Sequence, residues 1–444
     1  MCVGLLWRAT SLEKMLDAQV QTGAQEGVEE HAGAARTADI VVGLLSYNNA
    51  ATIGGIARDA QECLATYFPQ KRSVVVHADA GSKDGTQESA IGSAVNKNDF
   101  VQIAYPVYPA QKISPEYYGV PGKGNGIQAI FGVASELKAS ACAIVDTTTG
   151  TSGRDSLLTL VKTITEQEID FSAPCYLRHK YDATILNGIV YPLTRALYGK
   201  RIHQPIGGDY AISGKLMNFL MKQSRSESET TSSDSDAWVT VQALCGGFRF
   251  GEACLGPRTL SAHEPAPEVS ALLSQALGSM FTEMTRTAAF WQRVRGSQPV
   301  PAFGPSFDPL PDPPPVDPTP MLQSFRLGYQ NLQDIYRLLL PPATLMELKR
   351  LSFRTPDTFA FDDLLWARIV YDFALGWRGR VMDRDHLLGA LTPLYLGWVA
   401  SWLRAVHDDG PKEAQERIEK LCGAYEAQKS YLISRWRWPD RFNP

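Results

Sequence analysis

The chain has 444 residues, more than one ordinary hydrophobic core supports, so two or three domains are expected. Its composition is 44% hydrophobic and 20% charged, as in globular proteins, and a net charge of −4 argues against a nucleic-acid partner. No run reaches the about 18 apolar residues of a membrane span. The seven cysteines form no CxxC pair, and several lie in apolar runs that favour reduced, buried thiols. We therefore expect a cytoplasmic protein without a transmembrane segment.

The first part of the chain alternates apolar, β-branched runs with helical patterns, after an N-terminal arm at 1–37. Strands are expected at 39–45, 74–76, 100–107 and 141–145. Helices are expected from a cap at Thr52 to about Tyr67, and from the glycine-rich segment 121–126 to about Leu137. This alternation predicts an α/β fold with a Rossmann-like, mostly parallel sheet flanked by helices.

Polar residues follow these strands where ligands bind in open α/β sheets. Asp79 ends the second strand, and its carboxylate could accept hydrogen bonds from a nucleotide base or ribose. An Asx turn followed by a helix cap is the alternative interpretation. Asp146 ends a later strand, where a carboxylate suits a divalent cation or a sugar hydroxyl.

The segment PGKGNG at 121–126 surrounds Lys123 with glycines just before a predicted helix. Backbone N–H groups at a helix start suit a diphosphate. The spacing differs from GxxxxGK[ST], which argues against a P-loop NTPase. A surface loop with an incidental lysine is the alternative.

Several motifs occur in a characteristic order: SYNNAATI, ADAGSKDGT, PGKGNG, IVDTTTG, CYLRHKYD, QPIGGD, SDAW and AH, from Ser46 to His263. Together they resemble nucleotide-sugar glycosyltransferases of the GT-A fold, and are similar to mannosylglycerate synthase and glucosyl-3-phosphoglycerate synthase. The resemblance covers about residues 38–300. It implies sugar transfer from a GDP-mannose or UDP-glucose type donor, with Mn²⁺ or Mg²⁺ as cofactor.

The resemblance also implies a role for individual residues. The nucleotide-sugar would be bound by Ser46, Tyr47, Asn48, Asp79, Gly122, Lys123, Gln204, Gly207 and Gly208. The metal would be bound by Asp146 and His263, catalysis would involve Arg178, Asp209 and Asp236, and the acceptor would meet Thr148, Tyr176 and Asp182.

Thr148 departs from the family, which has a second aspartate there in its Asp-x-Asp motif. This predicts a weak metal site that forms together with the bound nucleotide. Two simpler interpretations remain open: Asp236 as the cap of the following helix, and 207–209 as an ordinary turn.

Helical periodicity dominates after residue 264. One long helix is expected at 267–295, and 296–320 holds ten of the 28 prolines, typical of an extended linker. Further helices are expected at 322–340, 361–377, 383–403 and 412–436. The predicted domains are therefore a GT-A catalytic domain at 38–295, a linker at 296–320 and an α-helical subdomain at 321–444. Its tryptophans would serve as core or as contacts in a homo-oligomer.

The preferred function is a retaining transferase that acts on a small hydroxyl acceptor such as glycerate or phosphoglycerate. The first alternative is an inverting transferase acting on a glycan or lipid, with Asp209 or Asp236 as general base. The second is a nucleotide-sugar-binding protein that has lost catalysis, as Thr148 suggests. A nucleotidyltransferase is the third, and it usually carries a basic, glycine-rich N-terminal loop that is absent here.

Overall fold

The computed structural model describes residues 37–105, 107, 120–147, 153–226, 236–258, 269–311 and 314–438. Residues 38–444 form one compact unit. The N-terminal arm lies outside the described residues except for its last residue, Thr37. Thr148 and His263 also lie outside them. Among the described residues, no helix combines the length and apolar character that a membrane crossing requires.

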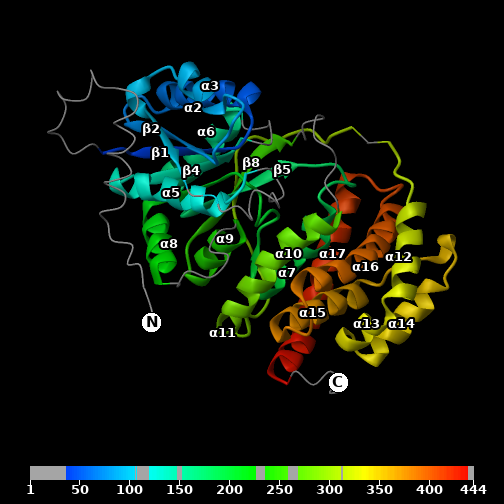
Figure 1. Ribbon diagram of the computed structural model, residues 1–444. Coiled ribbons are helices and arrows are strands. Elements are labelled where there is room, and N and C mark those ends of the chain that lie inside the picture. Colours follow the sequence, from blue (N-terminus) through cyan, green and yellow to red (C-terminus); the bar gives the residue numbers. More distant parts are fainter. Residues whose placement is uncertain are drawn as a thin grey trace. The chain divides into compact units, whose positions relative to one another are not determined.

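An eight-stranded sheet runs in the order β10-β8-β5-β7-β4-β1-β2-β3 (Figure 1). All neighbouring strands are parallel except β7, which runs antiparallel between β4 and β5. The strands are β1 (Ile40–Ser46), β2 (Ser73–Asp79), β3 (Phe100–Ala104), β4 (Ala141–Asp146), β5 (Phe171–Leu177), β7 (Tyr210–Ser213), β8 (Phe250–Pro257) and β10 (Ala302–Phe303). The predicted α/β fold with a mostly parallel sheet is confirmed.

The central strands are apolar on both sides because both faces of the sheet are covered. Along β1, Val41 and Leu45 enter one core, whereas Val42 and Leu44 enter the other. Figure 1 shows the helices that cover the two faces. They are α2 (Ala50–Tyr67), α3 (Thr86–Ser93) and α6 (Arg154–Glu166) on one side, and α5 (Lys123–Glu136), α8 (Gly214–Ser226) and α9 (Asp236–Cys245) on the other.

The pairing register aligns the ends of three strands. Ser46 of β1 is paired with Asp79 of β2, and Leu45 of β1 with Asp146 of β4. The polar residues that follow these strands therefore meet at one edge of the sheet.

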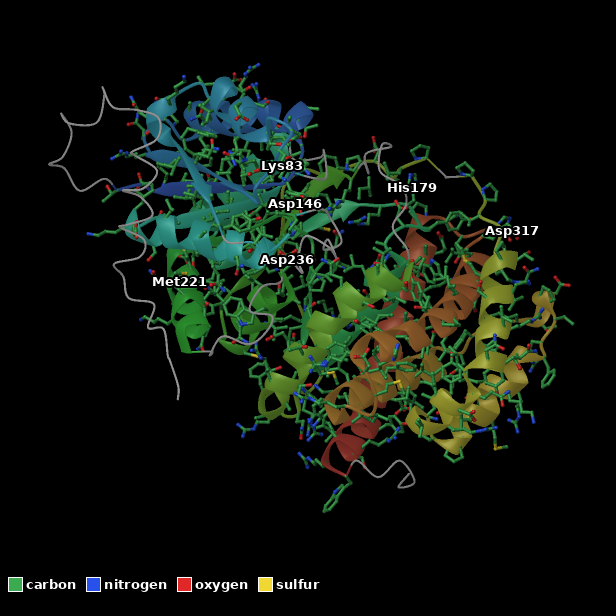
Figure 2. The ribbon with its side chains drawn as sticks, viewed as in Figure 1. Lys83, Asp146, His179, Met221, Asp236 and Asp317 are labelled. Atoms are coloured by element: carbon green, nitrogen blue, oxygen red, sulfur yellow. The ribbon has the colours of Figure 1, made fainter. Side chains whose placement is uncertain are left out.

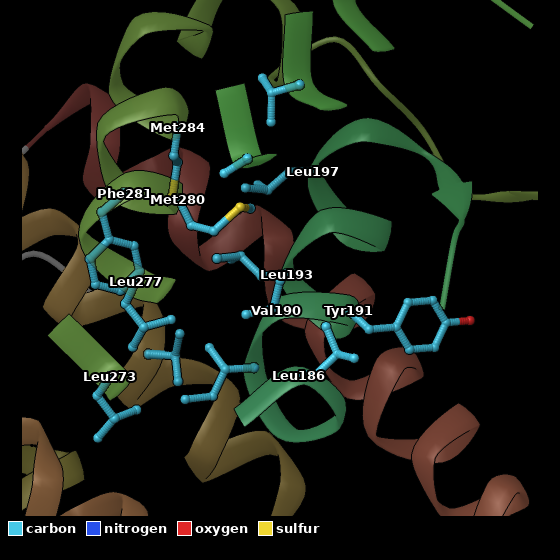
Figure 3. Close-up of a cluster of buried hydrophobic side chains, with 14 of the residues drawn as sticks. Leu186, Val190, Tyr191, Leu193, Leu197, Leu273, Leu277, Met280, Phe281 and Met284 are labelled. Atoms are coloured by element: carbon cyan, nitrogen blue, oxygen red, sulfur yellow. The ribbon is translucent and has the colours of Figure 1, made fainter. Parts of the chain in front are cut away.

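The C-terminal helical region shares the core of one sheet face. Helix α10 (Val269–Arg286) packs on the π-helical turn Leu186–Val190, and Figure 3 shows Met280 of α10 pointing toward Leu193 of α7 (Tyr191–Tyr198). After residue 318 follow α12 (Thr319–Asn331), α13 (Gln333–Leu339), α14 (Pro342–Ser352), α15 (Asp363–Gly379), α16 (Arg384–Ala405) and α17 (Pro411–Arg437). The predicted C-terminal helical region is confirmed, while the division into domains at 295 and 320 stays a prediction.

Three predicted helix bounds were wrong. Helix α2 starts at Ala50, before Thr52, because the Ala50 N–H donates to Asp84 Oδ2 from a neighbouring loop at 3.0 Å. The helix predicted at 267–295 ends at Arg286, where Thr287 Oγ1 donates to the Glu283 carbonyl at 2.7 Å, and is followed by the short α11 (Ala288–Trp291). The helix predicted at 322–340 is two helices, α12 and α13, which meet at Leu332.

Two other predicted segments also differ. The third strand, predicted at 100–107, ends at Ala104, where its pairing with β2 stops at Asp79. The proline-rich segment does not run wholly as a spacer. Its residues Ala302–Phe303 pair with β8 as an edge strand, and β9 (Gln298–Pro299) pairs with β6 (Lys200–Arg201). Prolines are tolerated there because an edge strand needs fewer backbone donors.

Candidate functional site

Hydrogen bonds tie together the loops at the carboxyl ends of β1, β2 and β4. The Asn48 N–H donates to Ser82 Oγ at 2.9 Å, which joins the loops after β1 and β2. Asn49 Nδ2 donates to Thr147 Oγ1 at 2.8 Å, which joins the loops after β1 and β4. Hydrogen bonds therefore join the three loops at this edge of the sheet.

Asp79 is fully buried at the end of β2. Its Oδ1 accepts from the hydroxyls of Ser46 at 3.2 Å and Ser82 at 2.5 Å. Its Oδ2 accepts from the N–H groups of Gly81 and Ser82 at 2.9 and 2.8 Å, and from Gln87 Nε2 at 2.8 Å. Burial raises the pKa of Asp79, but these hydrogen bonds outweigh it and the pKa is lowered overall.

A carboxylate offers about four lone-pair sites, and those of Asp79 are all occupied. A nucleotide base could reach Asp79 only by displacing one of its donors, such as the side chain of Gln87. The carboxylate organises the loop after β2, and its contact with a base stays a prediction. Beside it, Tyr47 is half-buried, and Asn48 is exposed with a φ of 50° and accepts from the Lys83 N–H at 3.1 Å.

The centre of the site is a cluster of one lysine and two aspartates. Lys123 is the first residue of α5, and its Nζ lies 3.1 Å from Asp146 Oδ2 and 3.1 Å from Asp236 Oδ2. Figure 2 labels both aspartates, which come from the end of β4 and the start of α9. Burial lowers the pKa of Lys123, but Asp236 and Asp146 outweigh it, so the pKa is raised and the ammonium stays charged.

Glycines let the backbone approach this cluster closely. Gly208 has a φ of 87°, and a Cβ there would lie 3.2 Å from Asp146 Oδ2. A Cβ on Gly207 would lie 2.3 Å from Pro174 Cγ. Gly122, before Lys123, has a φ of 61°. The Gly208 N–H donates to Asp236 Oδ2 at 3.2 Å, so the turn at 207–208 belongs to the site.

Asp209 is hydrogen-bonded to the backbone of Asp146, and Tyr176 is hydrogen-bonded to Asp209. Asp209 is buried and its Oδ1 accepts from the Asp146 N–H at 2.7 Å, while its Oδ2 accepts from the Tyr176 hydroxyl. Burial raises the pKa of Asp209, and nearby Arg258 and the Tyr176 hydroxyl oppose this without cancelling it. Gln204 Nε2 donates to the Tyr176 carbonyl at 3.1 Å, so Gln204 helps to position Tyr176.

A cavity of about 320 Å³ opens beside Lys123 and Asp236. Six residues singled out in the sequence line it: Lys123, Arg178, Asp182, Gly207, Gly208 and Asp236. Ser46, Tyr47, Asn48, Asp79, Gly122, Asp146, Tyr176, Gln204 and Asp209 are not among its lining residues. Some of the predicted site residues therefore face the cavity, whereas the others lie in the segments around it.

The cavity also has walls that sequence reasoning missed. Leu272, Ala276 and Ser279 come from one face of α10, and Tyr395 comes from α16. Nothing in the local sequence points from Tyr395 to a site in another part of the chain. Arg258 could have been found, because it follows directly after β8. Its guanidinium carbon lies 4.9 Å from the centre of the Tyr176 ring, and its Nη1 donates to the Gly207 carbonyl at 2.9 Å.

Asp236 has one carboxylate oxygen to spare. Its Oδ2 accepts from Lys123 and Gly208, while its Oδ1 is buried and has no hydrogen-bond partner among the described residues. A buried carboxylate oxygen without a partner is costly, so a ligand hydroxyl or a cation in the cavity would stabilise it. The cluster therefore offers the cavity one carboxylate oxygen, Asp236 Oδ1, next to the ammonium of Lys123.

No known family model and no curated protein matches this chain. Solved structures of glucosyl-3-phosphoglycerate synthase from Mycobacterium tuberculosis are similar to it. The complex with Mn²⁺, UDP and glucosyl-3-phosphoglycerate is 18% identical, covers 56% of this chain and 80% of the other, and has a TM-score of 0.41. The phosphoglyceric acid complex is 19% identical with the same coverage and a TM-score of 0.40.

The complex of that enzyme with Mn²⁺, UDP-glucose and glycerol 3-phosphate is 17% identical, again over 56% of this chain and 80% of the other, with a TM-score of 0.39. These values describe a distant likeness in fold. The matched enzyme is one of the two that the sequence motifs resemble.

Proposed function

We propose that this protein is a metal-dependent glycosyltransferase that moves a sugar from a nucleoside-diphosphate sugar to a small hydroxyl acceptor. Glycerate and phosphoglycerate are the acceptor types, and GDP-mannose or UDP-glucose the donor types, that the sequence motifs favour. The observation that carries the proposal is the Lys123–Asp146–Asp236 cluster, which borders a cavity and holds one carboxylate oxygen without a partner.

The charged residues of the site would each contribute to this reaction in a different way. A nucleoside diphosphate leaves as an anion, and Lys123 and Arg178, which both line the cavity, would stabilise the developing charge. Asp146 offers the hard carboxylate oxygen that Mn²⁺ or Mg²⁺ prefers. When bound, the ion would neutralise the diphosphate. Asp209 and Tyr176 would hold Asp146 in place rather than touch the sugar.

Asp236 would act on the sugar side. An anomeric carbon that loses its leaving group gains positive charge, which a nearby carboxylate stabilises. The unpartnered Oδ1 of Asp236 is available for this, or for a hydroxyl of the sugar or acceptor. Arg178 and Asp182 supply charged and hydrogen-bonding groups for the acceptor at the same cavity.

The test is release of nucleoside diphosphate from UDP-glucose and GDP-mannose with glycerate or phosphoglycerate, with Mn²⁺ and with EDTA. Asp146→Asn and Asp236→Asn should each lower kcat by at least about a hundredfold, as loss of a charge-stabilising group does. Asp408→Asn, at a side chain that is 97% exposed, is the matched control and should keep full turnover. Full activity in EDTA would remove the metal from the mechanism.

An inverting transferase is the second candidate, with Asp236 as general base. The free Oδ1 favours this role for Asp236 over Asp209, both of whose carboxylate oxygens are engaged and which does not line the cavity. The anomeric configuration of the product, read by NMR, separates the candidates: retention supports the first and inversion the second. Binding of UDP or GDP without any turnover would instead leave a nucleotide-sugar-binding protein.

A further inference from the structure

A second cluster of chemically reactive side chains lies on β5, β8 and the loop after β6. It consists of Cys175, His203 and Glu252, whose ligand atoms all lie within 4.8 Å of one another. Cys254 adjoins the cluster, and both cysteines are free thiols. None of these four residues lines the cavity, and none has a role in the proposed sugar transfer.

The sheet register explains why these residues meet. Cys175 of β5 is paired with Cys254 of β8, and Glu252 lies two residues before Cys254 on the same strand. Side chains two residues apart point to the same face of a sheet, so the thiols and the carboxylate share one face. His203 lies at the same place, because its backbone N–H donates to Glu252 Oε1 at 2.6 Å.

His203 and Glu252 form a hydrogen-bonded ion pair whose atoms are also possible metal ligands. His203 Nδ1 lies 2.9 Å from Glu252 Oε2 and 3.1 Å from Oε1. Glu252 is buried, with 3% of its surface exposed, and His203 is its ion-pair partner among the described residues. Thiolate, imidazole and carboxylate are the three ligand types of protein zinc sites.

We propose that Cys175, His203 and Glu252 bind a zinc ion, with Cys254 or water as the fourth ligand. The ion replaces the proton between His203 Nδ1 and Glu252, and the Cys175 thiol loses its proton to become a thiolate. Both protons pass to solvent, so binding involves no oxidation or reduction. Ligand atoms need move by only about 1 Å to reach metal–ligand distances of about 2.0–2.3 Å.

Such an ion would restrain the segment that carries the glycine turn next to the cavity. His203 directly precedes the segment from Gln204 to Asp209, which contains the glycine turn beside Asp146. A metal that ties His203 to β5 and β8 would restrain the start of that segment. The site is therefore structural, and it differs in ligands and place from the metal site proposed at Asp146.

The first experiment uses the full chain, reduced and freed of metal, titrated with Co²⁺ as a spectroscopic stand-in for zinc. A thiolate ligand gives a charge-transfer band in the near ultraviolet that oxygen ligands do not give. We expect this band at one equivalent in the wild type and in Asp146→Asn, and its absence in the double variant Cys175→Ser/Cys254→Ser, which removes both thiols at the site. A band that persists in the double variant, or no band in the wild type, would overturn the proposal.

Affinity for zinc is measured by competition with a chromogenic chelator. Cys175→Ser and His203→Ala should each weaken zinc binding by at least about tenfold, the lower range for perturbing a metal shell. Cys63→Ser, which changes a buried thiol of α2, should bind zinc as the wild type does.

A measurement on the wild type alone covers the case in which a variant fails to fold. Zinc should slow alkylation of Cys175 by iodoacetamide, followed by mass spectrometry of peptides. Cys245, which is also free and half-buried but lies in α9, should react at the same rate with and without zinc. Equal protection of both cysteines, or of neither, would contradict a site at Cys175.

Discussion

Lys123 and Asp236 are 113 positions apart in the chain, and Lys123 Nζ lies 3.1 Å from Asp236 Oδ2. Asp146 Oδ2 lies at the same distance from the ammonium. One buried cation therefore holds together the end of β4, the start of α5 and the start of α9. Removing it would leave both carboxylates without this cation.

Replacing Lys123 with Met should destabilise the fold and create a vacancy for a cation. Loss of one partner from a buried ion pair costs about 3–5 kcal/mol of unfolding free energy. Because Mn²⁺ can neutralise both carboxylates, it should recover part of that loss in Lys123→Met. Urea unfolding with and without Mn²⁺ measures both effects. Lys349→Met, at an exposed position of α14, should change neither quantity, and equal losses in the two variants would contradict the ion-pair interpretation.

Replacing Asp79 with Ala should lower stability as well as nucleotide affinity. The substitution leaves the buried N–H groups of Gly81 and Ser82 without an acceptor, and each unsatisfied group costs about 1–3 kcal/mol. Urea unfolding and calorimetric titration with UDP or GDP separate the two effects. Unchanged stability with affinity lowered by tenfold or more would favour direct contact between Asp79 and the base.

His77 should make the protein less stable in mild acid. It is fully buried on β2, where burial lowers its pKa from 6.5 to about 4 despite the opposing effect of Asp79. Between pH 6.5 and pH 4, His77 is therefore protonated in the unfolded chain but neutral in the folded protein. Stability falls as the pH drops through this range, by about 2 kcal/mol between pH 8 and pH 5.

The measurement is urea unfolding at pH 8 and pH 5 in the wild type and in His77→Gln. The difference between the two pH values should be smaller in His77→Gln by about 2 kcal/mol. His386→Gln, at an exposed position of α16, should behave as the wild type. Identical differences in all three proteins would mean that His77 stays protonated or becomes accessible in the fold.

A methyl group at Gly188 should disrupt the contact between the sheet-bearing part and the C-terminal helices. A Cβ there would lie 2.4 Å from the ring of Trp398. Its carbonyl also accepts from Trp366 Nε1 at 2.9 Å and from the Tyr425 hydroxyl at 3.0 Å. Overpacking of this kind costs about 1–3 kcal/mol.

Thermal unfolding of Gly188→Ala should therefore show a lower Tm than the wild type. The matched control is Gly389→Ala on α16, where a Cβ would meet no atom within 4 Å. Alanine favours a helix over glycine by roughly 0.5–1 kcal/mol, so this variant should have an unchanged or higher Tm. A lower Tm in both variants would point to a general effect of the substitution rather than to Trp398.

The sequence by itself determined the strands and the type of residue that follows each one. Apolar β-branched runs predicted β1, β2 and β4 because strands buried on both faces must be apolar throughout. It identified Asp236 through the family resemblance, and Lys123 and Asp146 through their local pattern, since lysine among glycines before a helix suits a phosphate and aspartate at a strand end suits a metal. These are local properties, visible within a few residues.

Only the tertiary structure decided which of these groups meet. It turned Asp79 inward onto Ser46, Ser82 and Gln87, and it brought Asp236 to Lys123 across 113 positions. It also placed Tyr395 of a C-terminal helix at the cavity, which no local pattern predicted. Ion pairs and hydrogen bonds depend on separations of a few ångströms, and these are set by strand register and helix packing rather than by spacing along the chain.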